Sequence, residues 1–194
     1  MIFGHLGVAG AAQSLSRARL GTVGFLAFLL AAVTPDVVDA VYFVVGFCSP
    51  FGLYSHTVPA ALLQTAVVAG IAYLATESAA TTATFAAIVL LHVPADFPTG
   101  HKLFMPGGEI FGLDFYRRPP LDLLLEVPVI FVGWWLLRRT GRGPSWARTR
   151  WAVGLVMLAQ TFLDVYGFGL GARKPSGCAT PVSPSERIVL VDVR

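Results

Sequence analysis

Long runs of apolar residues, separated by short polar or charged stretches, dominate this sequence. The runs cover residues 21–47, 57–75, 82–95, 121–137 and 151–170. A helix rises about 1.5 Å per residue, so roughly 20 apolar residues cross a hydrocarbon core of about 30 Å. Because the runs lack the alternating pattern of a membrane barrel, helices are the remaining way to satisfy backbone hydrogen bonds in lipid. The pattern predicts an all-α, polytopic transmembrane helix bundle with about five spanning helices.

A shorter apolar segment, residues 2–16, precedes the first of these runs. It is too short to span the bilayer, so we expect a short N-terminal helix. A turn near residues 17–21 then makes a helical hairpin with the next run. Counting at about 1.5 Å per residue along both arms brings His5 level with Asp36 and Asp39.

The composition fits a single membrane domain. The 194 residues are 55% hydrophobic and 13% charged, whereas a soluble domain carries about 25% charged residues. We expect a membrane-embedded helical domain over residues 1–172 and a flexible C-terminal tail over residues 173–194, which are rich in Pro and Ser. The basic residues are mostly Arg beside apolar runs, which indicates anchors in a lipid bilayer and no nucleic-acid binding. The oligomeric state is left open.

Basic residues are more numerous at one end of the predicted bundle. An up-and-down order of the helices puts seven of them at the end opposite to His5, namely Arg17, Arg19, Arg138, Arg139, Arg142, Arg148 and Arg150. The His5 end has five, namely Lys102, Arg117, Arg118, Arg173 and Lys174. Because cytoplasmic loops carry the excess of Lys and Arg, the Arg-rich end is predicted to be cytoplasmic and the His5 end extracytoplasmic.

Seven side chains that bind metals in proteins fall at the His5 end. They are His5, His56, His92, His101, Asp36, Asp39 and Asp96. Asp36 and Asp39 are three residues apart, and His92 and Asp96 are four apart, so each pair shares one helix face. An Asp in a lipid-embedded helix costs about 2.5–3.5 kcal/mol on insertion scales and usually marks a site. A divalent cation would relieve the repulsion between two carboxylates. Imidazole and carboxylate ligands together suit Zn best, with Mn or Fe as alternatives.

Three further polar residues have open roles. Glu126 and Asp164 lie about two turns below the His5 end, where they either hold ligand histidines or pair with Lys102 or Arg117. His101 lies in a loop, and its part in the site is left open.

Several short motifs resemble those of a known family. They are Gly4-His5-Leu6-Gly7, Thr34-Pro35-Asp36-Val37-Val38-Asp39, Tyr54-Ser55-His56-Thr57, His92 to Asp96 followed by Phe97-Pro98-Thr99-Gly100, Pro106-Gly107-Gly108, and Phe111-Gly112-Leu113-Asp114-Phe115-Tyr116. In this order, over about residues 1–140, they resemble the membrane-bound metal-dependent hydrolases, the YdjM-like inner-membrane proteins of bacteria. The resemblance implies a bacterial inner-membrane location and metal residues at His5, Asp36, Asp39, His56, His92 and Asp96. The sequence departs from the family at Ala40, where the family often has His.

These features lead to the hypothesis of a membrane-embedded, metal-dependent hydrolase. The expected metal ligands are His5, Asp36, Asp39, His92 and Asp96. The expected catalytic residues are His56 and Asp96, with His56 acting as a ligand, a general base or an anion contact. The residues expected to hold the phosphate of a lipid or lipid-linked ester or phosphoester are Lys102, Arg117 and Arg118.

Two other functions fit parts of the pattern. Acidic and His residues inside a bundle also form the ion or proton pathways of transporters, although the sequence shows no internal repeat of the kind many transporters have. The same residues also act as polar contacts between helices in a non-catalytic membrane scaffold.

Overall fold

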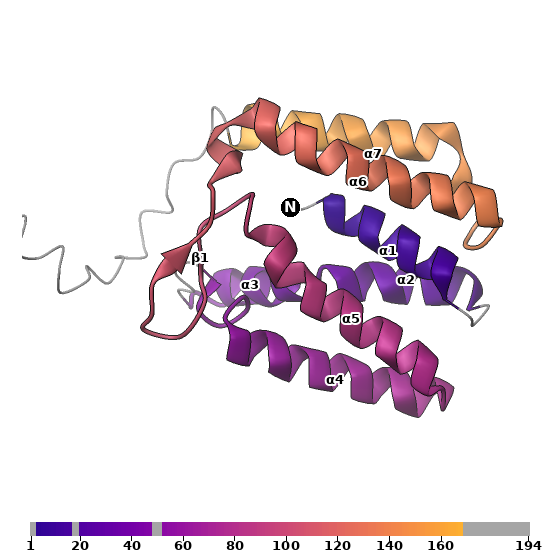
Figure 1. The fold of residues 1–194 in the computed structure, drawn as a ribbon, viewed down its shortest axis with the longest axis horizontal. Coiled ribbons are helices and arrows are strands. Elements are labelled where there is room, and N and C mark those ends of the chain that lie inside the picture. The colour runs from indigo at the N-terminus through magenta and orange to yellow at the C-terminus, as the bar shows by residue number, and fades with distance from the viewer. Residues whose placement is uncertain (1–2, 17–19, 48–51, 169–194) are drawn as a thin grey trace, which may run out of the picture.

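The computed structural model describes residues 3–16, 20–47 and 52–168, and within these ranges the chain is mostly helical (Figure 1). The α-helices are α1 (Gly4–Leu15), α2 (Gly21–Ala32), α3 (Thr34–Val44), α4 (Val58–Thr76), α5 (Ala79–Asp96), α6 (Pro119–Thr140) and α7 (Arg150–Phe162). The shorter helical segments are η2 (Phe115–Arg117), η3 (Trp146–Arg148) and the π-helical η4 (Leu163–Phe168). The predicted helical class is confirmed, and the predicted tail 173–194 lies outside the described residues.

One small sheet interrupts the helices between α5 and α6. Its strands β1 (Lys102–Leu103) and β2 (Ile110–Phe111) are antiparallel, with Lys102 opposite Phe111 and Leu103 opposite Ile110. Below, this segment is called the 102–111 hairpin.

Three helices are long and apolar enough to cross a membrane, namely α4, α5 and α6. The pair α2 and α3 adds a fourth only if the two are counted as one span, because the chain bends by 65° between them. Helix α7 has 13 residues before the backbone passes into η4. The prediction of about five spanning helices is therefore too high for the described residues, which contain three such helices, or four with the bent pair.

The predicted span 21–47 breaks at Thr34-Pro35. Pro35 lies in the first turn of α3, and proline has no N–H group with which to extend the hydrogen-bond ladder of the preceding helix. The chain therefore ends one helix and starts another. Asp36 consequently lies in the first turn of a new helix, where a carboxylate is favoured by the helix dipole.

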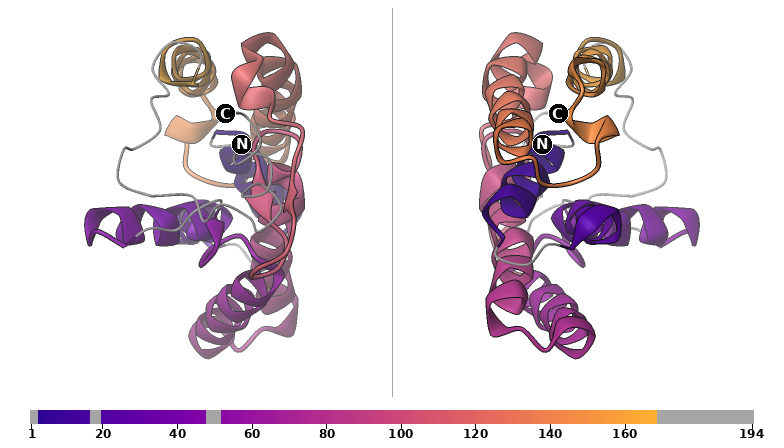
Figure 2. Two further views of the ribbon diagram at one scale, coloured as in Figure 1. Left: turned by 90° about the vertical axis from the view of Figure 1, so that its left-hand side faces the viewer. Right: turned by 90° about the vertical axis from the view of Figure 1, so that its right-hand side faces the viewer.

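Helix α1 occupies the centre of the bundle. Seen end-on, α6, α1, α5 and α4 follow one another in a row, while α7 and the α2–α3 pair project from the same side of that row (Figure 2). The backbones of α1 and α6 meet at Gly7 and Gly133, since a Cβ atom on either glycine would overlap the backbone of the other helix. Such small residues let membrane helices approach closely, and this contact sets the position of the preceding His5.

Both ends of the bundle follow the predicted up-and-down order. The start of α1, the start of α4, the end of α5 and the 102–111 hairpin gather at one end, on the left in Figure 1. At the opposite end, the Arg142 guanidinium donates a 3.1 Å hydrogen bond to the carbonyl of Ser14 and a second bond to that of Ser16. These carbonyls close the last turn of α1, where a cation is favourable.

Large apolar side chains remain exposed on the outer faces of the candidate spanning helices. Leu63 and Leu74 on α4 are 67% and 82% exposed, and Leu124 on α6 is 72% exposed. Several polar side chains are instead buried inside the bundle, including His5, His92 and Glu126. A surface of this kind is suited to lipid and not to water.

Candidate metal centre

Four side chains from three parts of the chain converge at the hairpin end of the bundle. They are Asp36 from α3, His56 from the loop before α4, and His92 and Asp96 from the last turns of α5. Each offers one ligand atom, and no two of these atoms are more than 4.8 Å apart. Below, these four residues are called the Asp36 group.

Local structure explains how each member reaches the group. The spacing of four puts His92 and Asp96 on one face of α5. His56 follows a tight turn at Gly52, whose φ is +71° and where a Cβ atom would lie 2.8 Å from the imidazole. The backbone N–H of His56 donates to the carbonyl of Gly52 at 2.8 Å. This turn aims the imidazole inwards, just before α4 begins.

Five of the six separations between ligand atoms of the Asp36 group are close to those of a tetrahedral ion site. Nε2 of His56 lies 3.2 Å from Nε2 of His92, 3.2 Å from Oδ2 of Asp96 and 3.5 Å from Oδ1 of Asp36. Nε2 of His92 lies 3.6 Å from each of the same two oxygens. A regular tetrahedron with edges of about 3.4 Å has its centre about 2.1 Å from each corner, which matches Zn–N and Zn–O bond lengths. The donor set therefore fits a small divalent ion.

The outer nitrogen of each imidazole in the group has its own acceptor. Nδ1 of His92 donates to the carbonyl of Ala32 at 2.7 Å. Nδ1 of His56 donates to Oγ of Ser55 at 2.6 Å, and Ser55 donates in turn to Asp39 at 2.5 Å. When each ring is neutral with its proton on Nδ1, both Nε2 atoms turn a lone pair towards the centre. Metal-binding histidines are commonly held in this way.

His5 and Asp39 lie behind members of the group. Nε2 of His5 donates to Oδ1 of Asp96 at 3.0 Å, while Oδ2 of Asp96 faces His56 and His92. The His5 ring also stacks on His92, with ring centroids 3.7 Å apart. Asp39 faces the outer nitrogen of His56, with Oδ2 3.4 Å from Nδ1. His5 therefore orients Asp96, and Asp39 orients His56. The sequence had instead suggested that His5 and Asp39 bind the ion directly.

The surrounding carboxylates stabilise a positive charge on or beside His56. This residue lies in a loop, outside the spanning helices. Burial disfavours its protonated form, but hydrogen bonds with Asp36, Asp39 and Asp96 outweigh burial and raise the pKa of His56 to about 9. A cation at the centre and a proton on His56 are therefore alternative ways to balance the same carboxylates.

Lys102 supplies one positive charge at the edge of the group. Its Nζ lies 3.3 Å from Nε2 of His56 and 3.6 Å from Oδ2 of Asp96. Together with Asp36 and Asp39, the site contains three carboxylates and one ammonium, which leaves a deficit of two positive charges when the histidines are neutral. A divalent ion matches that deficit.

The site is closed on one side and open on the other. The side chains of His56, His92 and Asp96 are at most 2% exposed, whereas those of Asp36, Asp39 and Lys102 are 33%, 28% and 22% exposed. A substrate would therefore approach along the side formed by α3 and the 102–111 hairpin.

The other predicted phosphate-binding residues belong to a separate surface cluster. Nε of Arg117 lies 2.9 Å from Asp114, and Nδ1 of His101 lies 3.8 Å from the same carboxylate. The side chains of Arg117 and His101 are 74% and 42% exposed, and Arg118 is exposed as well. Among the contacts of the described residues, only Lys102 of the three predicted cations reaches the Asp36 group.

Glu126 and Asp164 help to hold the start of α1. Glu126 accepts a 2.9 Å hydrogen bond from the backbone N–H of Gly4, the residue before His5. Gln160 accepts from the N–H of Phe3 at 3.3 Å and donates to Asp164 at 2.6 Å. These groups satisfy N–H groups at a helix start, which otherwise lack partners. They position His5 and do not pair with Lys102 or Arg117 in the described contacts.

Two residues of this arrangement, Ser55 and Asp122, were not predicted from the sequence to belong to the site. Ser55 was named only as part of a motif, but it links His56 to Asp39. Asp122 is fully buried, one helical turn before Glu126 on the same face of α6. Its spacing of four from Glu126 was the available signal.

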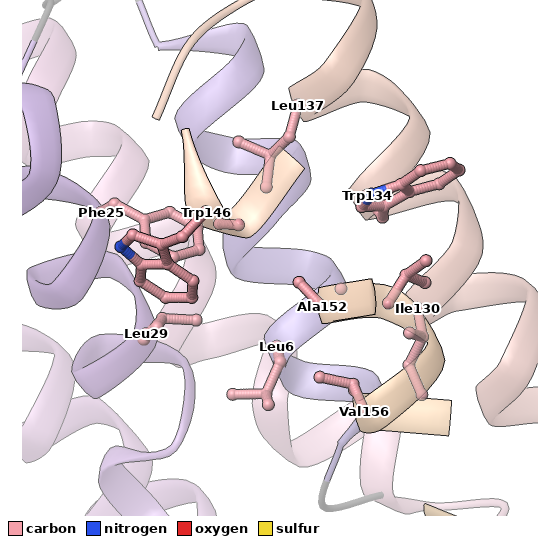
Figure 3. A pocket seen from close by; sticks show the side chains of 12 residues that line it. Leu6, Phe25, Leu29, Ile130, Trp134, Leu137, Trp146, Ala152 and Val156 are labelled. Atoms are coloured by element: carbon pink, nitrogen blue, oxygen red, sulfur yellow. The ribbon is translucent and has the colours of Figure 1, made fainter. Parts of the chain in front are cut away.

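An apolar cavity of about 200 Å³ lies apart from these polar groups, between α1, α2, α6 and α7. Figure 3 shows Leu6, Phe25, Trp134 and Trp146 among its lining side chains. No side chain with a titratable group lines it, so it offers no acid, base or metal ligand.

Comparison of the chain with models of known protein families, with curated proteins and with solved structures finds no match. The resemblance to membrane-bound metal-dependent hydrolases therefore stays a prediction from the sequence motifs.

Proposed function

We propose that this protein is a membrane-embedded, metal-dependent hydrolase whose ion is held by Asp36, His56, His92 and Asp96. The observation that carries the proposal is the spacing of four donor atoms, of whose six separations five are 3.2–3.6 Å and the sixth is at most 4.8 Å. The outer nitrogen of each imidazole also has a fixed acceptor, Ala32 or Ser55, as is usual for metal-binding histidines.

The donor set favours Zn, with Mn or Fe as alternatives. Two imidazole nitrogens and two carboxylate oxygens suit these ions better than Ca or Mg, which prefer oxygen ligands alone and more of them. An ion of this kind lowers the pKa of a bound water to about 7 and so supplies a nucleophile for hydrolysis.

The side chains have distinct proposed roles. His56 acts as a ligand and not as a free base, because both of its nitrogens are engaged. His5 and Asp39 act as positioning residues for Asp96 and His56. Asp36, the exposed member of the group, would give up its place on the ion to a water and accept a proton from it, while His56, His92 and Asp96 would remain as three buried ligands.

Lys102 has a proposed role in binding the anionic part of the substrate. Its flexible side chain reaches the group from the 102–111 hairpin, and it can turn towards a phosphate oxygen once a metal ion balances the carboxylates. Arg117 and Arg118 remain candidates only for contacts further out on the open side.

The substrate class follows from the surroundings of the site. We propose a lipid or lipid-linked ester or phosphoester, since such molecules reach a site at the end of spanning helices by diffusion within the bilayer. The family resemblance supports a bacterial inner membrane, and the Arg-rich helix ends support a cytoplasmic location for the opposite end of the bundle.

Lys102 also favours a second candidate function. Its ammonium lies where an ion would interact with His56 and Asp96, so the network could serve as a metal-free polar contact between helices. In this case the cluster stabilises the bundle and performs no hydrolysis.

Metal analysis of purified protein separates the two candidates. Elemental analysis of detergent-purified wild type should find about one transition-metal ion per chain. The Asp36→Asn/Asp96→Asn variant should lose it, while His101→Ala, at an exposed histidine outside the group, should retain it. Circular dichroism and thermal unfolding show whether each variant is folded. A folded wild type that holds no metal would overturn the hydrolase proposal. In that case, a loss of stability in Lys102→Met would support the metal-free polar contact.

A further inference from the structure

A second cavity lies between α4, α5 and the 102–111 hairpin, which contributes Phe104 just after β1. Its volume is about 470 Å³, within the range of roughly 300–1,000 Å³ typical of small-molecule sites. Its lining is wholly apolar and includes Val58, Leu62, Leu90, Val93, Phe97 and Phe104. This feature is called the α4–α5 groove below.

Sequence neighbours of the site residues form the mouth of the groove. Val58 is two residues after His56, Phe97 directly follows Asp96, and Phe104 is two residues after Lys102. The backbone N–H of Val58 donates to the carbonyl of Phe104 at 2.9 Å, which holds the hairpin against the start of α4. The mouth therefore adjoins both Lys102 and the proposed ion.

The floor of the groove lies deeper along the same two helices. Leu62 is six residues after His56 on α4, and Leu90 is six residues before Asp96 on α5. At about 1.5 Å per residue, both lie about 9 Å from the site along the helix axes. The groove thus runs away from the charged groups, in the direction of the lipid chains.

The groove faces lipid. Helices α4 and α5 are two of the three candidate membrane spans, and Leu62, Leu90 and Phe104 are 55%, 41% and 55% exposed. The apolar lining of the groove adds no binding free energy for a substrate without an apolar chain, whereas each methylene group buried in it contributes about 0.8 kcal/mol to binding.

We propose that the α4–α5 groove holds a fatty acyl chain of a phospholipid substrate whose phosphate head group lies at Lys102 and the metal ion. This inference rests on the proposed hydrolase function for the position of the head group. The positive charge of Lys102 at the mouth is complementary to a phosphate, and the apolar walls are complementary to an acyl chain. The distance to Leu62 and Leu90 sets the depth available to the chain.

Binding of two probes to variants of the groove tests the proposal. The probes are dipalmitoyl phosphatidic acid and the water-soluble glycerol 3-phosphate, measured by native mass spectrometry of the detergent-purified protein. In Leu62→Trp/Leu90→Trp, indole rings fill the floor. The matched control Leu63→Trp/Leu91→Trp changes neighbouring exposed leucines, 67% and 55% exposed, that do not line the groove.

We expect wild type and the control variant to bind phosphatidic acid at least tenfold more tightly than glycerol 3-phosphate. The groove variant should lose about tenfold in affinity for phosphatidic acid only, as expected when about two methylene groups are displaced. Equal binding of both probes to wild type, or equal losses in the groove and control variants, would overturn the proposal.

Metal analysis of the same protein preparations keeps this proposal separate from the hydrolase proposal. If wild type holds no metal but the groove variant still loses phosphatidic acid specifically, the groove assignment stands and the hydrolase proposal fails. If metal is present but chain-dependent binding is absent, the hydrolase proposal stands and the groove assignment fails.

Discussion

His5 donates a hydrogen bond from Nε2 to Oδ1 of Asp96, and this leaves Oδ2 of Asp96 facing the two imidazoles of the Asp36 group. The two oxygens of one carboxylate therefore have different tasks. One accepts from a buried neutral imidazole, and the other is available to an ion. Residues that hydrogen-bond to a metal ligand, as His5 does to Asp96, commonly change metal affinity by 10–100-fold without being ligands themselves.

Replacing His5 should therefore weaken the metal site without removing it. We expect His5→Ala to lower metal affinity by roughly 10–100-fold, while Asp96→Asn abolishes binding. His5→Gln, which keeps a donor, should recover part of the loss. Competition with a chelator of known affinity measures all three. If His5→Ala abolishes binding as completely as Asp96→Asn, His5 is a ligand after all.

Metal affinity should fall as the pH is lowered. The pKa of His56 is raised to about 9 without metal, so its imidazole is protonated at neutral pH and must lose that proton to bind an ion. Below about pH 9, apparent affinity should therefore decrease by about tenfold per pH unit for one released proton, and above about pH 9 it should level off. Calorimetry in buffers of different ionisation enthalpy counts the proton, and release of none would contradict this reading.

Lys102 should compete with the ion and assist the substrate. Since its ammonium lies 3.3 Å from Nε2 of His56, Lys102→Met removes a like charge from the metal position and should bind metal at least as tightly as wild type. The same variant should lose affinity for phosphatidic acid because it lacks the cation at the groove mouth. Arg117→Met is a matched control, since Arg117 pairs with Asp114 on the surface. Equal effects of the two substitutions would argue against a specific role for Lys102.

Close contact between α1 and α6 should be essential for stability. A Cβ atom on Gly7 or Gly133 overlaps the facing backbone, so Gly7→Ala should destabilise the protein by about 1–3 kcal/mol and weaken metal binding by displacing His5. Gly154→Ala, at a helical glycine with nothing within 4 Å of its added Cβ, should leave both properties unchanged. Thermal unfolding in detergent and metal titration check the pair.

Much of the arrangement follows from local pattern. Apolar runs predicted the helices, and their up-and-down order predicted that Asp36, His56, His92 and Asp96 share one end. The spacing of four between His92 and Asp96 decides their common face, because the helical period alone sets that relationship. The number of spanning helices was overestimated because hydropathy shows neither the bend at Pro35 nor the change from α7 to a π-helix after Phe162.

The tertiary structure alone decided which atoms meet. His5 lies behind Asp96, and Asp39 lies behind His56, although all four have the residue types of ligands. Arg117 turns to Asp114, while Lys102 reaches the site from the hairpin. Relationships within one helix depend on its fixed period, but those between helices depend on how each helix is rotated and how closely it packs. Here the contact of Gly7 with Gly133 and the 65° bend between α2 and α3 set those rotations, and neither is encoded in the hydrophobic pattern.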